Sequence, residues 1–167
     1  MQNTMPSTAP LEEQVGQLLN EQHLTLGCAE SCTGGLIGHR LTNVPGSSAY
    51  FLGSVVAYAY DAKERLLGVN HNTLYDHGAV SEPTALEMAR GARRVLGADL
   101  AISVTGIAGP GGGMPDKPVG LTWIALSARD HDEARSFVWE GDRAAVKAQS
   151  AEAALRMVRE YLLKLGG

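Results

Sequence analysis

The chain lacks the features of a membrane, secreted or nucleic-acid-binding protein. No apolar run approaches the 18 residues of a membrane span, and residues 1–10 have neither the basic start nor the apolar stretch of a signal peptide. The net charge of −4 argues against the broad basic face by which proteins bind nucleic acid. We therefore expect a cytoplasmic protein that binds no nucleic acid and no membrane.

Cysteine is scarce, and its spacing excludes the common metal and redox motifs. Cys28 and Cys32 match neither the zinc pattern nor the C-x-x-C pattern, and no cluster of His, Cys, Asp and Glu has ligand spacing. The sequence therefore predicts no metal site, and both cysteines are interpreted as small buried thiols. Cys32 remains an alternative nucleophile, because a thiolate at a helix N-terminus is activated by the helix dipole.

Glycine, in contrast, is abundant. The chain has 20 glycines in 167 residues, above the average usage of about 7 %, and they gather at the ends of apolar runs. The length suits one domain, and the apolar fraction of 44 % is typical of a globular protein. We expect a flexible N-terminal segment over 1–10 and a single domain over 11–167.

Alternating patterns predict an α/β fold. Apolar periodicity and capping residues predict helices that start near Pro10, Leu36, Asp61, Ser81 and Asp142, with Asp61 and Asp142 as caps. Runs of apolar and β-branched residues predict strands at 24–29, 50–58, 100–105, 119–128 and 134–140. The alternation predicts a parallel sheet covered on both faces, and the last two strands form a hairpin that makes the sheet mixed.

One glycine-rich segment places a serine between an apolar strand and a helix. In Ala29-Glu30-Ser31-Cys32-Thr33-Gly34-Gly35, the helix start offers unpaired N–H groups to an oxyanion or a phosphate, so Ser31 is a candidate nucleophile. The alternative is structural: Ser31 or Thr33 caps the helix, and the glycines relieve crowding.

A second glycine-rich segment, Thr105 to Gly113, also follows an apolar strand. Ligands of open α/β sheets bind beyond the carboxyl ends of the strands, so the two segments are expected to face one crevice. Neither segment contains a P-loop or a complete G-x-G-x-x-G motif. The alternative for this segment is a flexible surface loop.

A nucleophilic serine needs a base, and no histidine pairs with a carboxylate in a recognised pattern. Lys63 is the other candidate, because burial can lower a lysine pKa toward about 7 to 8. It lies beyond a predicted strand that ends at Tyr58, so the two side chains are expected to reach the same crevice. The alternative is a solvated surface lysine.

Five segments agree in order and spacing with one family. They are Ala29-Glu30-Ser31-Cys32-Thr33-Gly34-Gly35, Tyr58 with Lys63, His77-Gly78-Ala79-Val80-Ser81, Thr105-Gly106-Ile107-Ala108-Gly109-Pro110 and Lys117-Pro118-Val119-Gly120. Together they closely resemble the CinA C-terminal domain family, over nearly the whole chain after about Leu11.

The resemblance implies a three-layer α/β/α sandwich with a mixed, mostly parallel sheet. It also implies a nicotinamide-nucleotide amidase, which hydrolyses nicotinamide mononucleotide to nicotinic acid mononucleotide and ammonia without a metal or cofactor. The family's nucleophile, lysine and tyrosine correspond to Ser31, Lys63 and Tyr58. The larger N-terminal domain of many relatives is not expected, which implies a stand-alone form. Tyr60 and Lys147 depart from the residues usual in relatives.

We therefore expect Lys63 to accept the Ser31 proton, with Tyr58 orienting or relaying it. The expected partner is a small-molecule substrate, nicotinamide mononucleotide, and the expected assembly is a homo-oligomer. A catalytically silent binding or interaction protein is the alternative. The residues expected to hold the oxyanion are Thr33, Gly34, Gly35 and Thr105, and those expected to hold the phosphate are Gly106, Gly109, Gly111, Gly112 and Arg143.

Overall fold

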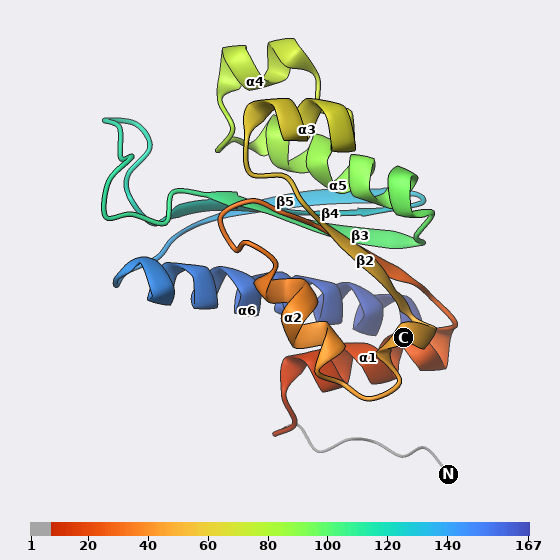
Figure 1. The fold of residues 1–167 in the computed structure, drawn as a ribbon. Coiled ribbons are helices and arrows are strands. Elements are labelled where there is room, and N and C mark those ends of the chain that lie inside the picture. The colour runs from red at the N-terminus through yellow and green to blue at the C-terminus, as the bar shows by residue number, and fades with distance from the viewer. Residues whose placement is uncertain (1–7) are drawn as a thin grey trace.

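A five-stranded mixed sheet forms the middle layer of the molecule (Figure 1). The computed structural model describes residues 8–167. The strand order is β2-β1-β3-β4-β5, with β2, β1 and β3 parallel and β4 antiparallel to both β3 and β5. Four strands thus run in one direction, which confirms the mixed, mostly parallel sheet. The strands are β1 (Leu26–Glu30), β2 (Phe51–Val56), β3 (Leu100–Gly106), β4 (Leu121–Ala128) and β5 (His131–Val138).

Helices cover both faces of this sheet, as the alternating sequence pattern predicts (Figure 1). One face carries α1 (Leu11–Gln22), α2 (Leu36–Thr42) and α6 (Arg143–Gly166). The other face carries α3 (Tyr60–Leu67), α4 (His71–His77) and α5 (Glu82–Leu96), and a short 3-10 turn, Ser47–Ala49, precedes β2. The three-layer α/β/α sandwich is therefore confirmed.

The central strands are buried on both sides. Every residue of β1 is buried, and so is every residue of β3 except Gly106. Such strands read as continuous apolar runs rather than as alternating ones, which explains why the sequence marks them clearly. At the edges, β2 and β5 have partly exposed residues.

Helix ends agree with the sequence in most places. Ser81 and Asp142 accept hydrogen bonds from the backbone N–H groups of Thr84 and Ala145, as N-caps do. The Asp61 cap is wrong, because α3 begins one residue earlier, at Tyr60, with Ala59 at its N-cap and no side-chain cap bond. A cap must lie outside the helix, and Asp61 lies in the first turn.

Two further elements differ from the sequence prediction. Helix α4 was not predicted, because only Leu74 in it is buried and the segment has no apolar stripe. Strand β5 begins at His131 rather than at Ala134, so the hairpin turn is shorter than the polar run suggested. Of the segment predicted as flexible, 1–10, residues 1–7 lie outside the described residues.

The topology brings the two glycine-rich segments together. Strands β1 and β3 are parallel neighbours, and Glu30 at the end of β1 is paired with Val104 near the end of β3. The segments that follow these strands therefore leave the sheet at the same edge. None of the helices formed by residues 8–167 is long and apolar enough to cross a membrane.

Candidate active site

Ser31 is the first residue after β1, and its backbone is held by the neighbouring strand. Its N–H donates to the carbonyl of Val104 at 3.0 Å, and the residue is 7 % exposed. The hydroxyl therefore stands at the carboxyl edge of the sheet on a fixed backbone. This position suits a reacting group, because neighbouring loops leave space for a ligand there.

The capping interpretation of this serine is wrong. Helix α2 begins at Leu36, and its N-cap is Gly35, which has φ 102° and makes no side-chain cap bond. Thr33 does not cap it either, because its hydroxyl donates to Glu30 Oε1 at 2.8 Å. The Ser31 hydroxyl is thus not used by the helix.

The side chain of Lys63, in the first turn of α3, points toward the Ser31 hydroxyl. Its Nζ lies 3.0 Å from Ser31 Oγ and 2.9 Å from the carbonyl oxygens of both Ala57 and Tyr58. The residue is 1 % exposed, and no described carboxylate forms an ion pair with it. The surface-lysine alternative is therefore wrong.

Burial sets the charge of this lysine. Removal from water disfavours the ammonium form and lowers the pKa of Lys63 to about 8. A neutral amine has two N–H donors and one lone pair. Two carbonyls accept from the donors, so the lone pair is left for the Ser31 hydroxyl. The geometry thus suits a base that takes a proton from Ser31.

Tyr58 contributes its backbone carbonyl to Lys63, whereas its hydroxyl contacts Arg143 at the same cavity. The ring is 63 % exposed, and its hydroxyl accepts from Arg143 Nη2 at 3.0 Å. No hydrogen bond joins that hydroxyl to Ser31 or Lys63. Orientation of Lys63 by Tyr58 thus occurs through the main chain, and a relay through the hydroxyl has no support in the contacts.

Cys32 lies beside the serine but is poorly suited to attack. It is 5 % exposed, and burial raises the pKa of its thiol to about 11. Since the thiolate is the nucleophilic form, this cysteine remains protonated and unreactive near neutral pH.

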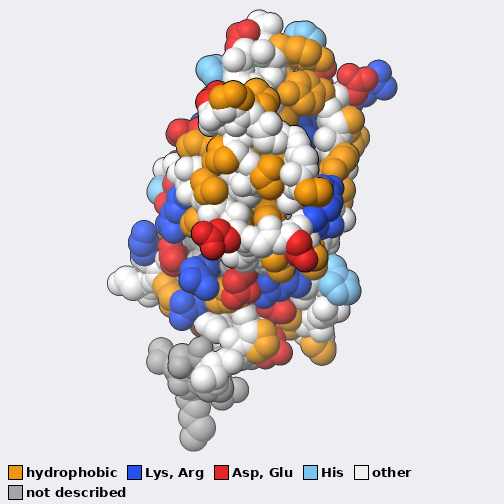
Figure 2. Space-filling model, turned by 90° about the vertical axis from the view of Figure 1, so that its left-hand side faces the viewer, with side chains coloured by type: hydrophobic (Ala, Val, Ile, Leu, Met, Phe, Trp, Pro, Cys, Tyr) orange, Lys and Arg blue, Asp and Glu red, His pale blue; other side chains and the backbone are white. Residues whose placement is uncertain are grey.

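These side chains line a small cavity of about 180 Å³. It lies on the edge where β1 and β3 end, the left-hand side of Figure 1, which faces the viewer in Figure 2. Apolar side chains gather over the middle and upper parts of that face. The cavity is lined by Ser31, Cys32, Tyr58, Lys63, Ala79, Val80, Thr105, Gly106, Ala108 and Arg143. A larger cavity of about 610 Å³, which includes Asp99 and His131, has none of these residues.

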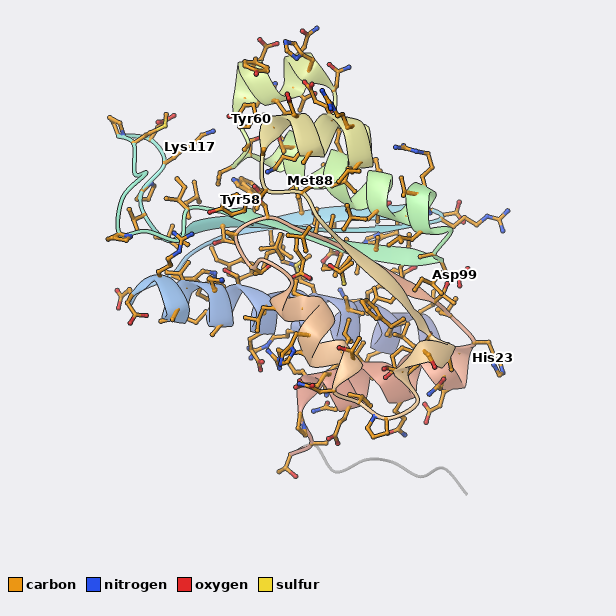
Figure 3. All side chains as sticks on the ribbon, in the orientation of Figure 1. His23, Tyr58, Tyr60, Met88, Asp99 and Lys117 are labelled. Atoms are coloured by element: carbon orange, nitrogen blue, oxygen red, sulfur yellow. The ribbon has the colours of Figure 1, made fainter. Side chains whose placement is uncertain are left out.

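The Thr105 hydroxyl lines this cavity but is already used. It donates to the carbonyl of Ala79 at 2.8 Å, so in this arrangement its proton is directed away from an oxyanion. The contact instead ties β3 to the segment after α4. Tyr60 supports the same segment, since its hydroxyl accepts from the N–H of Ala79 at 3.2 Å; Figure 3 shows Tyr60 above Tyr58.

Only some of the residues predicted to bind the phosphate line the cavity. Arg143 lies at its rim and donates from Nη1 to the carbonyl of Gly109 at 2.8 Å. Gly106 lines the cavity, whereas Gly111 and Gly112 are exposed and lie outside its lining.

The residues after Cys32 also lie outside the cavity lining. They are Thr33, Gly34 and Gly35. Lys147 approaches this turn from α6, and its Nζ is 3.7 Å from the position that a Cβ would take on Gly34. Among residues 8–167, no group of three or more His, Cys, Asp or Glu side chains could hold a metal ion.

Glu30 is a further residue of the site, and no role for it was predicted from the sequence. This glutamate is fully buried at the end of β1, and its carboxylate accepts four hydrogen bonds. Its charge suggests a surface residue, and only contacts with later parts of the chain reveal its place. Its position in a run of buried residues, directly before the candidate serine, was the one available signal.

Known proteins resemble this chain over nearly its whole length. The family model of the CinA C-terminal domain matches residues 8–162. A CinA-like protein of Chlorobaculum tepidum is 54% identical over 155 residues, which are 90% of this chain and 37% of that protein. A putative competence-damage inducible protein of Moorella thermoacetica is 49% identical over 148 residues, 89% of this chain and 36% of that protein. The chain thus spans little more than a third of these relatives.

Solved structures share the fold. A CinA superfamily protein from Klebsiella pneumoniae has a TM-score of 0.89 and 36% sequence identity, with 92% of this chain and 96% of that chain covered. A competence/damage inducible protein from Agrobacterium tumefaciens has a TM-score of 0.86 and 39% identity, with 95% and 99% covered.

Proposed function

The chain belongs to the CinA C-terminal domain family, and from this we propose that it is a nicotinamide-nucleotide amidase. The reaction is hydrolysis of the carboxamide of nicotinamide mononucleotide to nicotinic acid mononucleotide and ammonia. The observation that carries the proposal is the 3.0 Å approach of Lys63 Nζ to Ser31 Oγ in a buried site. A serine beside a buried lysine is a known solution for attack on an amide.

The proposed reaction begins with proton transfer. Neutral Lys63 takes the proton of Ser31, and Oγ attacks the carboxamide carbon to form a tetrahedral intermediate. The Lys63 ammonium then gives its proton to the leaving nitrogen, which departs as ammonia and leaves an ester on Ser31. Water, deprotonated by the same amine, attacks the ester and releases the acid, and Ser31 regains its proton.

Backbone groups are the candidates for holding the oxyanion. The Thr105 hydroxyl is used by Ala79, and the N–H of Gly34 donates to the carbonyl of Ser31 at 3.1 Å. Within residues 8–167 the N–H of Cys32 donates to no carbonyl, and Cys32 also lines the cavity. The N–H of Cys32, the residue after the nucleophile, is therefore the strongest candidate.

The size of the cavity fits one part of the substrate. About 180 Å³ suits the carboxamide-bearing ring, whereas ribose and phosphate must extend over the rim. Arg143 lies there, and its guanidinium has no carboxylate partner in the described chain. A phosphate would therefore find a planar, bidentate donor at this point.

The test is ammonia release from purified protein incubated with nicotinamide mononucleotide. The mononucleotide should give ammonia and nicotinic acid mononucleotide, and free nicotinamide should react poorly because it lacks the phosphate. Binding of the mononucleotide without turnover, from neutral pH to above pH 9, would support the catalytically silent binder instead. Equal turnover of nicotinamide would remove the role given to Arg143.

A further inference from the structure

Glu30 is a buried carboxylate with no cation beside it. The residue is 0 % exposed, and it forms no ion pair with any Lys, Arg or His of residues 8–167. An unpaired buried charge is costly unless hydrogen bonds replace its hydration. Hydrogen bonds must therefore stabilise this carboxylate next to the proposed nucleophile.

Four donors from three separate segments satisfy this carboxylate. Oε1 accepts from the hydroxyl of Thr33 at 2.8 Å and from the N–H of Ile37 at 2.9 Å. Oε2 accepts from the N–H of Gly38 at 3.1 Å and from the hydroxyl of Ser54 at 2.6 Å. One side chain thus ties the turn after β1 to helix α2 and to strand β2.

Two of these bonds cap helix α2 from outside it. Ile37 and Gly38 are the second and third residues of a helix whose own N-cap, Gly35, has no side chain. An N-cap side chain normally accepts from these N–H groups, and a negative charge is favourable at this helix end. Because Glu30 does this, no hydroxyl of the turn is needed as a cap, and Ser31 Oγ remains available to Lys63.

The backbone carbonyl of Glu30 is also linked to Lys63, the proposed base. The carbonyl of Glu30 accepts from the N–H of Ala57 at 2.9 Å, and the carbonyl of Ala57 accepts from Lys63 Nζ at 2.9 Å. Glu30 is therefore joined to Ser31 through the next peptide bond and to Lys63 through Ala57. The same residue thus contacts the segments that carry both reacting side chains.

We infer that Glu30 is a positioning residue, whose carboxylate caps α2 and fixes the turn so that Ser31 Oγ stays within reach of Lys63 Nζ. The inference rests on the proposed serine–lysine mechanism. It assigns no contact with substrate to Glu30.

Glu30→Gln is the sharpest change, because it keeps the size of the side chain. The amide nitrogen must replace one carboxylate oxygen, and it then faces the N–H of Ile37 or of Gly38, neither of which can accept. One cap bond is lost in either orientation. Glu133→Gln is the matched control, since that carboxylate lies in β5 and pairs with Arg135.

The experiment measures the rate at which a phosphonofluoridate probe labels Ser31, together with kcat and KM for nicotinamide mononucleotide and thermal melting. We expect E30Q to lower labelling and kcat by about 10- to 100-fold with KM nearly unchanged, as a misplaced nucleophile does. E133Q should behave like the wild type. The midpoint of the pH profile should stay where it is, because Lys63 is not paired with Glu30.

The outcomes separate the positioning role from the proposed reaction. Folded E30Q with wild-type labelling and kcat overturns the inference, and a lower melting temperature alone marks a purely structural role. Wild-type protein that is labelled but releases no ammonia refutes the substrate and leaves the inference standing. A wild-type Ser31 that does not react overturns both.

A second pair of variants keeps the test valid if E30Q does not fold. Thr33→Val removes one hydroxyl donor to Glu30 and should slow labelling, whereas Thr33→Ser keeps the hydroxyl and should restore the rate. Equal labelling of the two variants overturns the inference.

Discussion

Two glycine-rich segments follow neighbouring parallel strands, and they differ in how they are held. In the turn at 31–35, Ser31, Cys32 and Thr33 are buried, and Glu30 ties the turn to α2 and β2. In the loop after β3, residues 110–116 are all exposed. That loop is closed on itself by hydrogen bonds between Ile107 and Gly120 and between Met114 and Lys117.

The comparison shows that glycine content alone does not identify a functional segment. Both segments depend on glycine for their shape: φ is 102° at Gly35 and 88° at Gly112. What distinguishes the turn is the number of bonds from distant parts of the chain. The loop reaches the cavity at Gly106 and Ala108 and, through the carbonyl of Gly109, at Arg143.

The largest effect is expected from Ser31→Ala in the turn. Loss of the nucleophile should lower kcat for nicotinamide mononucleotide by at least about 10⁴-fold. Folding, followed by circular dichroism, should be little changed, because a single hydroxyl is removed. Cys32→Ser is the control and should keep substantial activity. An inactive cysteine variant beside an active S31A protein would show that the nucleophile has been misassigned.

Lys63→Met should have the next largest effect. The substitution keeps the apolar stem and removes the amine, so kcat should fall about 10²- to 10⁴-fold, as for a lost general base. Substrate binding, measured by calorimetry, should change much less. Near-normal kcat in this variant would mean that Lys63 is a structural lysine.

Arg143→Gln tests the contact between the loop and the rim of the cavity. Loss of a bidentate, charge-assisted contact should raise KM for nicotinamide mononucleotide about 10- to 100-fold, with a smaller change in kcat. For nicotinamide riboside, which has no phosphate, kcat/KM should change by less than about threefold. An equal loss for both substrates would show that Arg143 does not act on the phosphate.

The same substitution in the two segments gives the smallest but most direct contrast. Gly35→Ala places a side chain at φ 102°, which should cost about 1–3 kcal/mol of stability and reduce turnover. Gly111→Ala meets no atom within 4 Å, and the residue has no left-handed φ. Its melting temperature and kcat should match the wild type. Similar losses in both variants would contradict the difference between turn and loop.

Much of the fold was predictable because local signals and burial agree. The buried strands β1 and β3, the hairpin, the helix start at Ser81 and the cap at Asp142 follow from patterns within a few residues. Helix α4 was not predicted, because only one of its seven side chains is buried and the segment therefore has no apolar periodicity.

The residues of the candidate site were predictable from the sequence, but the hydrogen bonds among them were not. The serine and the lysine could be named from the sequence and the family resemblance. Nothing local shows, however, that these two side chains, 32 positions apart in the chain, come within 3.0 Å of each other. The hydroxyl of Thr105 and the carboxylate of Glu30 bond to groups from other elements. Such tertiary partners decide which polar groups are free to react, and sequence patterns do not contain them.

The pH dependence of kcat/KM tests the central claim most directly, because the Ser31–Lys63 mechanism needs a neutral amine in the free enzyme. Burial lowers the pKa of Lys63 to about 8, so protonation should remove the base as the pH falls below that value. From pH 6 to pH 10, kcat/KM for nicotinamide mononucleotide should rise tenfold per pH unit, bend near pH 8 and then level off. A profile that is flat across this range, or that falls as the pH rises through 8, would contradict the role of Lys63 as the base.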